Sequence, residues 1–297
     1  MLSLDPKDLT VQRLHQLLLG AIGPRPIAFA STIDREGKPN LAPFSFFNVF
    51  SANPPILVFS PARSGRTGQS KDTYNNAKAH PEVVINVVNY NMVHQMSLAS
   101  SPYAPEVDEF IKAGFTPLAS EKVAPFRVAE APVQFECKIQ QIIELGQEGG
   151  AGNLIICEVV QLHIQEDLLN EQGLIDQHKI DLVARMGGDW YCRANTTSMF
   201  EVKKPITSCG IGYDALPQDL KNSHILSAND LGQLAGIEQI PNETDVNEYK
   251  LLELSSLFLD LEHDASALET ALHQRAKALL AQNNLEEAWL TLLSFNN

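Results

Sequence analysis

Two segments of the chain gather the side chains that could do chemistry, residues 40–48 and residues 60–73. The first, NLAPFSFFN, places serine and asparagine side chains among three phenylalanine rings. The second, SPARSGRTGQSKDT, collects hydroxyls, two arginines and a lysine just before a predicted helix. A flat, partly polar ligand needs apolar surface with a few placed hydrogen-bonding groups, as the first segment offers. A phosphate monoester suits the second segment, because the unpaired amides of a helix start carry partial positive charge.

Each segment alone also has a simpler interpretation. The first could be a hairpin that packs its phenylalanines in a core, and the second a solvated loop before a capped helix. Taken together, they match a ligand with a planar ring at one end and a phosphate at the other, and FMN is the cofactor that this pairing predicts. Arg66 would supply a forked donor and Lys71 a point charge. Asp72 is predicted to cap the helix, which would occupy its carboxylate.

Most of the elements that must position these segments are predicted strands. Residues 24–33 and 41–50 form the expected antiparallel pair around a charged turn, and residues 5–19 predict an amphipathic helix. Many strands at short spacing with few helices favour an antiparallel barrel or sandwich. The chain has no glycine-rich dinucleotide fingerprint after a strand and no Walker-type loop, which argues against a doubly wound fold. Further strands are expected over residues 56–60, 82–88, 131–145 and 153–164.

The composition changes after about residue 200. Residues 201–297 hold 15 acidic and 6 basic side chains, against 21 and 16 in residues 1–200. Apolar residues recur at helical spacing there, and a capped helix is expected over residues 226–237. Two or three further helices are expected over residues 247–263, 266–282 and 285–294. We therefore divide the chain into a flavin-binding domain, residues 1–200, and an acidic, mostly helical C-terminal extension, residues 201–297.

Charge and cysteine usage exclude several classes of function. The net charge of −14 argues against nucleic acid or an anionic membrane as a partner. The four cysteines form no C-x-x-C pair and have no histidine at ligand spacing, so no metal site is predicted. No stretch reaches the ~18 apolar residues of a membrane span, and the N-terminus lacks the pattern of a signal peptide. We expect a cytoplasmic protein with free thiols.

A series of short motifs, in order over residues 20–195, resembles the flavin reductase-like, FMN-binding split-barrel family, in its branch of DIM6/NTAB-type flavoproteins. The motifs are PRPIA (24–28), NLAPFSFFN (40–48), PPIL (54–57), KDT (71–73), VIN (84–86) and RMGG (185–188), followed by Tyr191. The resemblance does not extend to the last hundred residues. It implies a mainly β fold: an FMN-binding split β-barrel with flanking short helices, plus an α-helical C-terminal extension.

The same resemblance implies a homodimer with FMN near the subunit interface. The flavin itself carries hydride or electrons, so no catalytic acid or base is expected from the protein. Residues 45–48 would contact the isoalloxazine, and residues near the helix start would hold the phosphate. The cofactor-binding residues that the resemblance implies are Ser45, Phe46, Phe47, Asn48, Ser60, Arg66, Lys71, Asp72, Thr73 and Asn86.

The expected function is an FMN-dependent, flavin reductase-like oxidoreductase, with NAD(P)H as a candidate co-substrate. One departure bears on that co-substrate. Classical reductases of this fold carry a Gly-Asp-His turn where this chain has Gly152-Asn153, and asparagine does not titrate. His163 and His178 are near in sequence and could reach the site. The alternatives are a non-catalytic FMN-binding electron-transfer module, or a partner-docking protein that binds an acceptor enzyme or protein through its C-terminal helices.

Overall fold

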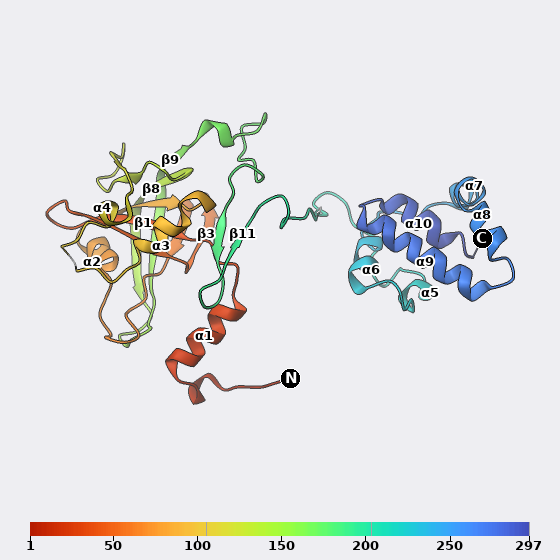
Figure 1. The fold of residues 1–297 in the computed structure, drawn as a ribbon, viewed down its shortest axis with the longest axis horizontal. Helices are drawn as coiled ribbons and strands as arrows, with labels where there is room; N and C mark the ends of the chain where they lie inside the picture. Colours follow the sequence, from red (N-terminus) through yellow and green to blue (C-terminus); the bar gives the residue numbers. More distant parts are fainter. Residues whose placement is uncertain (105, 203, 297) are drawn as a thin grey trace. The chain divides into compact units, whose positions relative to one another are not determined.

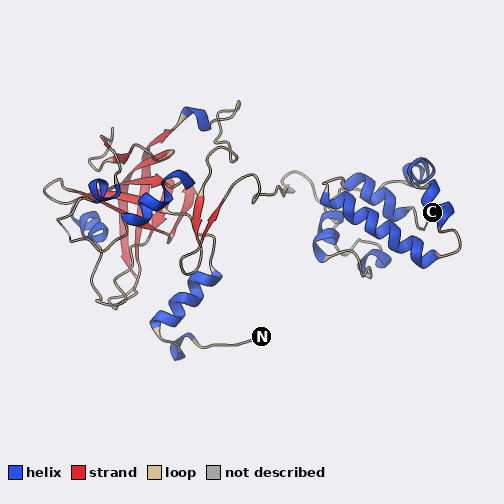
Figure 2. Cartoon of the chain, viewed as in Figure 1, coloured by secondary structure: helices blue, strands red, loops and turns tan. Residues whose placement is uncertain are grey.

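The structure is a computed structural model that describes residues 1–104, 106–202 and 204–296. The chain divides into two compact units, Met1–Phe200 and Glu201–Asn297 (Figure 1). The first unit holds the strands and the second consists of helices and loops (Figure 2). Among the helices of the described residues, none is long and apolar enough to cross a membrane.

A seven-stranded antiparallel sheet forms the centre of the first unit. Its order is β2-β1-β5-β8-β9-β4-β3, so β2 and β3 are the two ends of the sheet. The long hairpin of β8 and β9 lies between the two shorter groups of strands. The strands are β1 (Ala28–Ile33), β2 (Pro39–Phe44), β3 (Phe47–Ala52), β4 (Pro55–Phe59), β5 (Glu82–Val87), β8 (Val133–Glu144) and β9 (Asn153–Ile164).

The link between β2 and β3 closes this sheet into a barrel. Only Ser45 and Phe46 separate the two strands, so the chain can span at most about 11 Å between them. In a flat sheet of seven strands the first and last strands would lie about 29 Å apart. The sheet must therefore curl round, and since β2 and β3 share no hydrogen-bonded ladder within the described residues, the barrel stays split between them.

This link corrects one prediction from the sequence. Residues 41–50 were expected to form one strand paired with residues 24–33, but the chain leaves β1 after Phe44 and pairs with β4 from Phe47 onward. Phe44, Ser45 and Phe46 alternate, but Phe46 and Phe47 are adjacent apolar residues, so the alternation shifts phase where the chain changes partner. The prediction of a single strand did not use this shift.

Two hydrophobic clusters cover the two faces of β1, which is buried along its whole length. Ala28 and Ala30 belong to a cluster with Leu57, Phe59 and the β5, β8 and β9 side chains, while Phe29 belongs to another with α3 and α4. The small alanines face the closely packed barrel strands, and the large ring faces the helices.

Short helices and hairpins surround the barrel. Two of them frame the site: α1 (Val11–Ala21), with the 3-10 turn η1 (Pro6–Asp8) before it, and α2 (Asp72–Ala79). The helix predicted over residues 5–19 thus begins later, because Thr10 caps α1. The remaining elements are η2 (Tyr90–Met92), α3 (Val93–Leu98), α4 (Glu109–Ala113), β6 (Pro117–Leu118), β7 (Arg127–Val128), η3 (Glu166–Leu168), β10 (Val183–Arg185) and β11 (Tyr191–Arg193).

The second unit packs its helices around Trp289, which is completely buried and donates its Nε1 hydrogen to the carbonyl oxygen of Leu234 at 3.1 Å. The helix expected over residues 226–237 is present as α6 and carries a capping box formed by Ser227 and Asp230. The helix expected over residues 247–263 is divided at the buried Leu254. The helices are α5 (Gln218–Lys221), α6 (Ala228–Leu234), α7 (Glu243–Glu253), α8 (Ser255–Asp260), α9 (Ala265–Ala281) and α10 (Leu285–Leu293).

Candidate functional site

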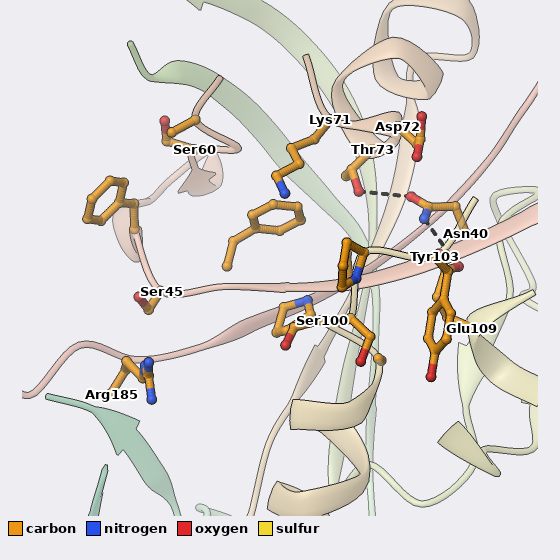
Figure 3. A pocket seen from close by; sticks show the side chains of 18 of the residues that line it. Asn40, Ser45, Ser60, Lys71, Asp72, Thr73, Ser100, Tyr103, Glu109 and Arg185 are labelled. Atoms are coloured by element: carbon orange, nitrogen blue, oxygen red, sulfur yellow. Dashed lines mark hydrogen bonds between the residues drawn. The ribbon is translucent and has the colours of Figure 1, made fainter. Parts of the chain in front are cut away.

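A cavity of about 420 Å³ opens beside the split of the barrel (Figure 3). The link between β2 and β3, the start of α2 and the segment after α3 supply most of its wall. This volume lies within the usual range for small-ligand sites. The lining residues that carry polar or charged side chains are His15, Arg25, Asn40, Ser45, Ser60, Lys71, Asp72, Thr73, Ser100, Ser101, Tyr103, Glu109 and Arg185.

The start of α2 gives the cavity an anion-binding end. Lys71 occupies the N-cap position without a capping side-chain hydrogen bond, and the amides of Asp72 and Thr73 find no acceptor within the described residues. In Figure 3 the Lys71 ammonium points toward the middle of the cavity, while the Asp72 carboxylate lies beyond Thr73. Asp72 was predicted to cap the helix, and this was wrong: it is the first helical residue, and its carboxylate accepts none of the helix amides.

Asn40 fixes the hydroxyl of Thr73. Thr73 Oγ1 donates to Asn40 Oδ1 at 2.9 Å, and Thr32 Oγ1 donates to the same oxygen at 3.3 Å. The Asn40 amide nitrogen in turn donates to Glu109 Oε2 at 3.2 Å. The Thr73 hydrogen is therefore in use, and the hydroxyl offers the cavity only lone pairs. It can accept a hydrogen bond from a ligand hydroxyl, whereas a phosphate dianion is better served by Lys71 and the α2 amides.

Glu109 is a half-buried carboxyl at this end of the cavity. It accepts from the Leu41 backbone amide at 3.0 Å as well as from Asn40. Burial raises the pKa of Glu109, and the two hydrogen bonds oppose that rise only in part. The cavity thus combines the Lys71 cation with a carboxyl that resists ionisation.

Arg25 holds the opposite side of the cavity together. Its guanidinium donates to the carbonyl oxygens of Leu19 and Met186 at 2.8 Å each, to that of Ile22, and weakly to Ser45 Oγ at 3.4 Å. The α1 carbonyls that end a helix are thereby satisfied by a cation. Gly187 packs against the same helix end, since a Cβ there would meet the Gly20 Cα at 3.0 Å. Arg25 is almost completely buried and serves as a structural clamp.

The apolar wall lies next to this clamp. The Phe46 ring meets the imidazole of His15 edge-on, with centroids 6.4 Å apart, and the Phe44 ring lies 5.6 Å from that of Phe59. Ser60 Oγ accepts the backbone amide of Asn153 at 3.0 Å, which leaves its own hydrogen available to a ligand. Hydroxyl, aromatic and cationic groups therefore face one cavity, in the combination expected for a flat phosphorylated ligand.

The structure brings together six of the ten residues predicted to bind the cofactor. The six that line the cavity are Ser45, Phe46, Ser60, Lys71, Asp72 and Thr73. Phe47 packs its ring against the barrel core, and the Asn48 side chain accepts its neighbour's amide on an exposed strand. Arg66 is exposed on the loop before α2, away from the cavity lining.

Asn86 has a structural role instead. It is completely buried, donates to the Phe29 carbonyl oxygen at 3.0 Å and accepts the Val128 amide at 2.9 Å, so both ends of its amide are in use. Asn153 likewise lies behind Ser60 and donates to the Pro61 carbonyl oxygen at 2.9 Å. His163 pairs with the buried Glu136 at 2.7 Å, and His178 is exposed.

Sequence reasoning missed several residues of this cavity. Arg25, Asn40 and Arg185 stood in the recognised motifs, but nothing in their spacing gave them a role. Glu109, Tyr103 and His15 belong to segments far from the motifs, and only the fold brings them to the cavity. The thiols of Cys137 and Cys157 are buried in the barrel, and burial raises the pKa of both, so they are protonated at neutral pH.

Comparison with known proteins places the first unit among proteins of related sequence and fold. The model of the flavin reductase like domain matches residues 21–181. An uncharacterised protein of Halalkalibacterium halodurans is 36% identical over 209 residues, which cover 70% of this chain and 98% of that protein. Nitrilotriacetate monooxygenase component B from Bacillus cereus is 33% identical with a TM-score of 0.64, covering 68% of this chain and 98% of the other.

A structure from Shewanella frigidimarina with a split barrel domain has a TM-score of 0.57 at 22% identity, covering 68% of this chain and all of that one. At this identity the likeness speaks for the fold alone. Together with the curled seven-stranded sheet, it confirms the predicted fold class, a split β-barrel followed by helices.

Proposed function

This chain belongs to the flavin reductase-like family, as its motifs indicated, and on that basis we propose that it is an FMN-dependent oxidoreductase. The observation that carries the proposal is the cavity at the split of the barrel. One end presents Lys71 and the free amides of α2, and the other an aromatic wall beside Ser45. Ring and phosphate recognition in one cavity favours FMN.

The residues of the cavity suit the successive parts of FMN. Lys71 and the amides of Asp72 and Thr73 would hold the phosphate, with the Ser60 hydroxyl as a further donor. The Thr73 oxygen, fixed by Asn40, would accept a hydrogen bond from the ribityl chain. Phe46, Pro43 and the backbone around Ser45 would line the ring. Bound flavin would carry the hydride or electrons, while these residues orient it and limit its contact with water.

The name of the Bacillus cereus relative describes one component of a monooxygenase. This supports a role in which the present protein passes electrons on to an acceptor enzyme, which the acidic C-terminal helices would bind. NAD(P)H is the proposed electron donor. The buried, non-titrating Asn153 favours the second candidate, an electron-transfer module that is reduced by another protein. Anaerobic mixing with NADH or NADPH separates the two, because only a reductase would bleach its flavin.

We further propose that the first unit forms a homodimer. None of the eleven residues of α1, all of them described, is buried, although the helix carries exposed Val11, Leu17 and Leu18. Val49 and Phe50 on the edge strand β3 are also exposed. Apolar side chains on an ordered helix and an edge strand are typical of a surface that a second copy covers.

Comparison of FMN with riboflavin tests the phosphate assignment. Lys71→Met should weaken FMN binding about tenfold or more, because a charge-assisted hydrogen bond is lost, and should change riboflavin binding less than about twofold. Thr73→Val should weaken both flavins alike, since its hydroxyl faces the shared ribityl chain. Quenching of flavin fluorescence on titration gives the dissociation constants.

Lys78→Met provides the matched control, because Lys78 lies on the same helix but pairs with Glu144 outside the cavity. It should leave both affinities unchanged. An equal loss of FMN and riboflavin in Lys71→Met would refute the phosphate site. A purified protein that binds neither flavin would refute the proposed function as a whole.

A further inference from the structure

A second cavity, of about 500 Å³, adjoins the first. The two share Pro43, Ser45, Ser100 and Arg185 as common wall, so a ligand in one would lie against a ligand in the other. The second cavity is otherwise lined by the apolar side chains of Ile27, Met96 and Tyr191, and by Ser97 and Asp189. It offers apolar surface, three serine hydroxyls, the Tyr191 hydroxyl, one cation and one carboxylate.

The cation, Arg185, is held in place but not saturated. Its backbone pairs with that of Arg25 through two hydrogen bonds of 2.9 and 3.0 Å, and its guanidinium stacks over the Tyr191 ring at 4.6 Å. Across residues 1–104, 106–202 and 204–296, the guanidinium has no hydrogen-bonded acceptor. Its charged neighbours are the Arg25 guanidinium, which repels it, and the fully exposed Asp189 carboxylate at 4.0 Å, a distance and an exposure at which an ion pair contributes little.

The contrast with Arg25 identifies which cation a ligand would meet. The Arg25 guanidinium is buried and donates its hydrogen bonds to backbone carbonyl oxygens. The Arg185 side chain is 29% exposed and borders both cavities. Figure 3 shows Arg185 near Ser45 and across the cavity from Lys71. The phosphate end and this cation are thus separate charges on opposite sides. A guanidinium with free forked donors matches a carboxylate or a phosphate in both charge and shape.

We propose that the second cavity binds the co-substrate of the flavin site, and that this co-substrate is a small organic anion whose carboxylate or phosphate is held by Arg185. The inference rests on the proposed flavin in the first cavity, because the shared wall is what brings the two ligands together. The apolar side chains of Ile27, Met96 and Tyr191 would cover the flat or apolar body of the ligand. The serine hydroxyls would complete its polar contacts.

A charged ligand and its neutral isostere test this proposal. Benzoate and benzamide have nearly the same shape, and their affinities for the full chain saturated with FMN can be measured by calorimetry or ligand-observed NMR. Benzoate should bind about tenfold tighter or more. Arg185→Met should abolish that preference, and Arg185→Lys should keep part of it. Titration of NADH and NADPH in parallel identifies the anionic group. If Arg185→Met lowers the affinity for either nucleotide, Arg185 binds a phosphate. If it lowers the affinity for benzoate alone, Arg185 binds a carboxylate.

Two further variants keep the result interpretable. Asp189→Asn removes a carboxylate that repels an anionic ligand, so benzoate should bind up to a few-fold tighter, opposite in sign to Arg185→Met. Lys78→Met removes a cation that lies outside both cavities and pairs with Glu144, and it should leave benzoate affinity unchanged. Circular dichroism checks that each variant is folded.

The inference is overturned if wild-type protein binds benzoate and benzamide equally, or if Arg185→Met leaves the preference for benzoate unchanged. A protein that fails to bind FMN refutes the proposed function instead. In that case the benzoate and benzamide comparison, repeated without flavin, still decides whether Arg185 holds an anion.

Discussion

Glu109 and Asn40 set the hydrogen-bond polarity of the proposed phosphate end. While Glu109 accepts from the Asn40 amide nitrogen, the Asn40 oxygen must face Thr73 and take its hydrogen. The carboxyl therefore determines whether Thr73 presents lone pairs or a hydrogen to a ligand, although it lies two hydrogen bonds away. Substitution of Glu109 should alter flavin recognition without any direct contact with the ring.

The raised pKa of Glu109 predicts a pH-dependent stability. A carboxyl whose pKa is higher in the folded state than its ordinary value of about 4.3 stabilises the fold below that value. This contribution is lost as the pH rises through the folded pKa. Glu109→Gln cannot ionise, so its melting temperature relative to the wild type should increase between about pH 4 and pH 7. A difference that stays constant with pH would contradict the raised pKa, which carboxyl-detected NMR measures directly.

At the scale of single residues, the sequence predicted which types of side chain line the cavity better than it predicted their hydrogen-bond partners. Lys71 and Ser60 were identified because cations and hydroxyls before a helix suit an anion wherever the helix packs. Asn86 does not line the cavity, because both ends of its amide form hydrogen bonds with the Phe29 and Val128 backbone. Its motif gave no indication of these two bonds. Glu109 was missed because it reaches the cavity only through the packing of α4 against β2.

The helix α1 is fixed at its C-terminal end and contacts the Phe46 ring through His15, but other apolar side chains along it remain exposed. Arg25 and the close approach of Gly187 hold the last turn of α1. The side chains of Leu17 and Leu18 are exposed. A helix of eleven residues is marginal on its own in water, and its contacts with the barrel leave Leu17 and Leu18 exposed. The proposed dimer would bury these two side chains.

Charge-neutral polar substitutions on α1 test the dimer. Leu17→Gln with Leu18→Gln should raise the dimer dissociation constant more than about tenfold, because burial of each leucine contributes ~1.5–3 kcal/mol. Sedimentation velocity measures the change. Leu251→Gln with Leu252→Gln on α7 is the matched pair, since those leucines are also exposed, and it should leave the association unchanged. A protein that is monomeric before any substitution would refute the proposed dimer.

Among the elements, regular periodicity was predicted well and chain reversals poorly. The β8–β9 hairpin and the helices of the second unit follow their hydrophobic patterns. The exchange of partner at Ser45 and Phe46 was not predicted, because residues 41–50 are mostly apolar, no glycine marks the exchange, and the phase shift between Phe46 and Phe47 was not used.

The whole molecule consists of two units with separate hydrophobic clusters. The barrel clusters include only residues of the first unit, and the cluster around Trp289 only residues of the second. Each unit should therefore tolerate damage to the other. The net charge of residues 201–297, with 15 acidic against 6 basic side chains, would favour a basic surface on a docking partner.

The two tryptophans test this independence. Trp289→Ala should destabilise the helical unit by about 3–5 kcal/mol, because it empties a buried site, yet should change FMN affinity less than about twofold. Trp190→Ala is the exposed counterpart in the first unit and should leave helical stability unchanged. Far-UV circular dichroism follows the helices and flavin titration follows the barrel. Loss of flavin binding in Trp289→Ala would show that the barrel depends on the second unit.

The two-residue link between β2 and β3 has a consequence for how recognition can vary. The outer edges of these strands have no strand partner within the described residues, and side chains take the place of one at the Leu41 amide, bound by Glu109, and at the Val49 amide, bound by Asn48. A ligand in the seam could bind the remaining main-chain groups, whatever side chains stand at Ser45 and Phe46. One inserted residue would widen the seam by up to about 3.5 Å and turn the following strand onto its other face. The length of the link, more than the identity of its two residues, therefore sets the width of the seam.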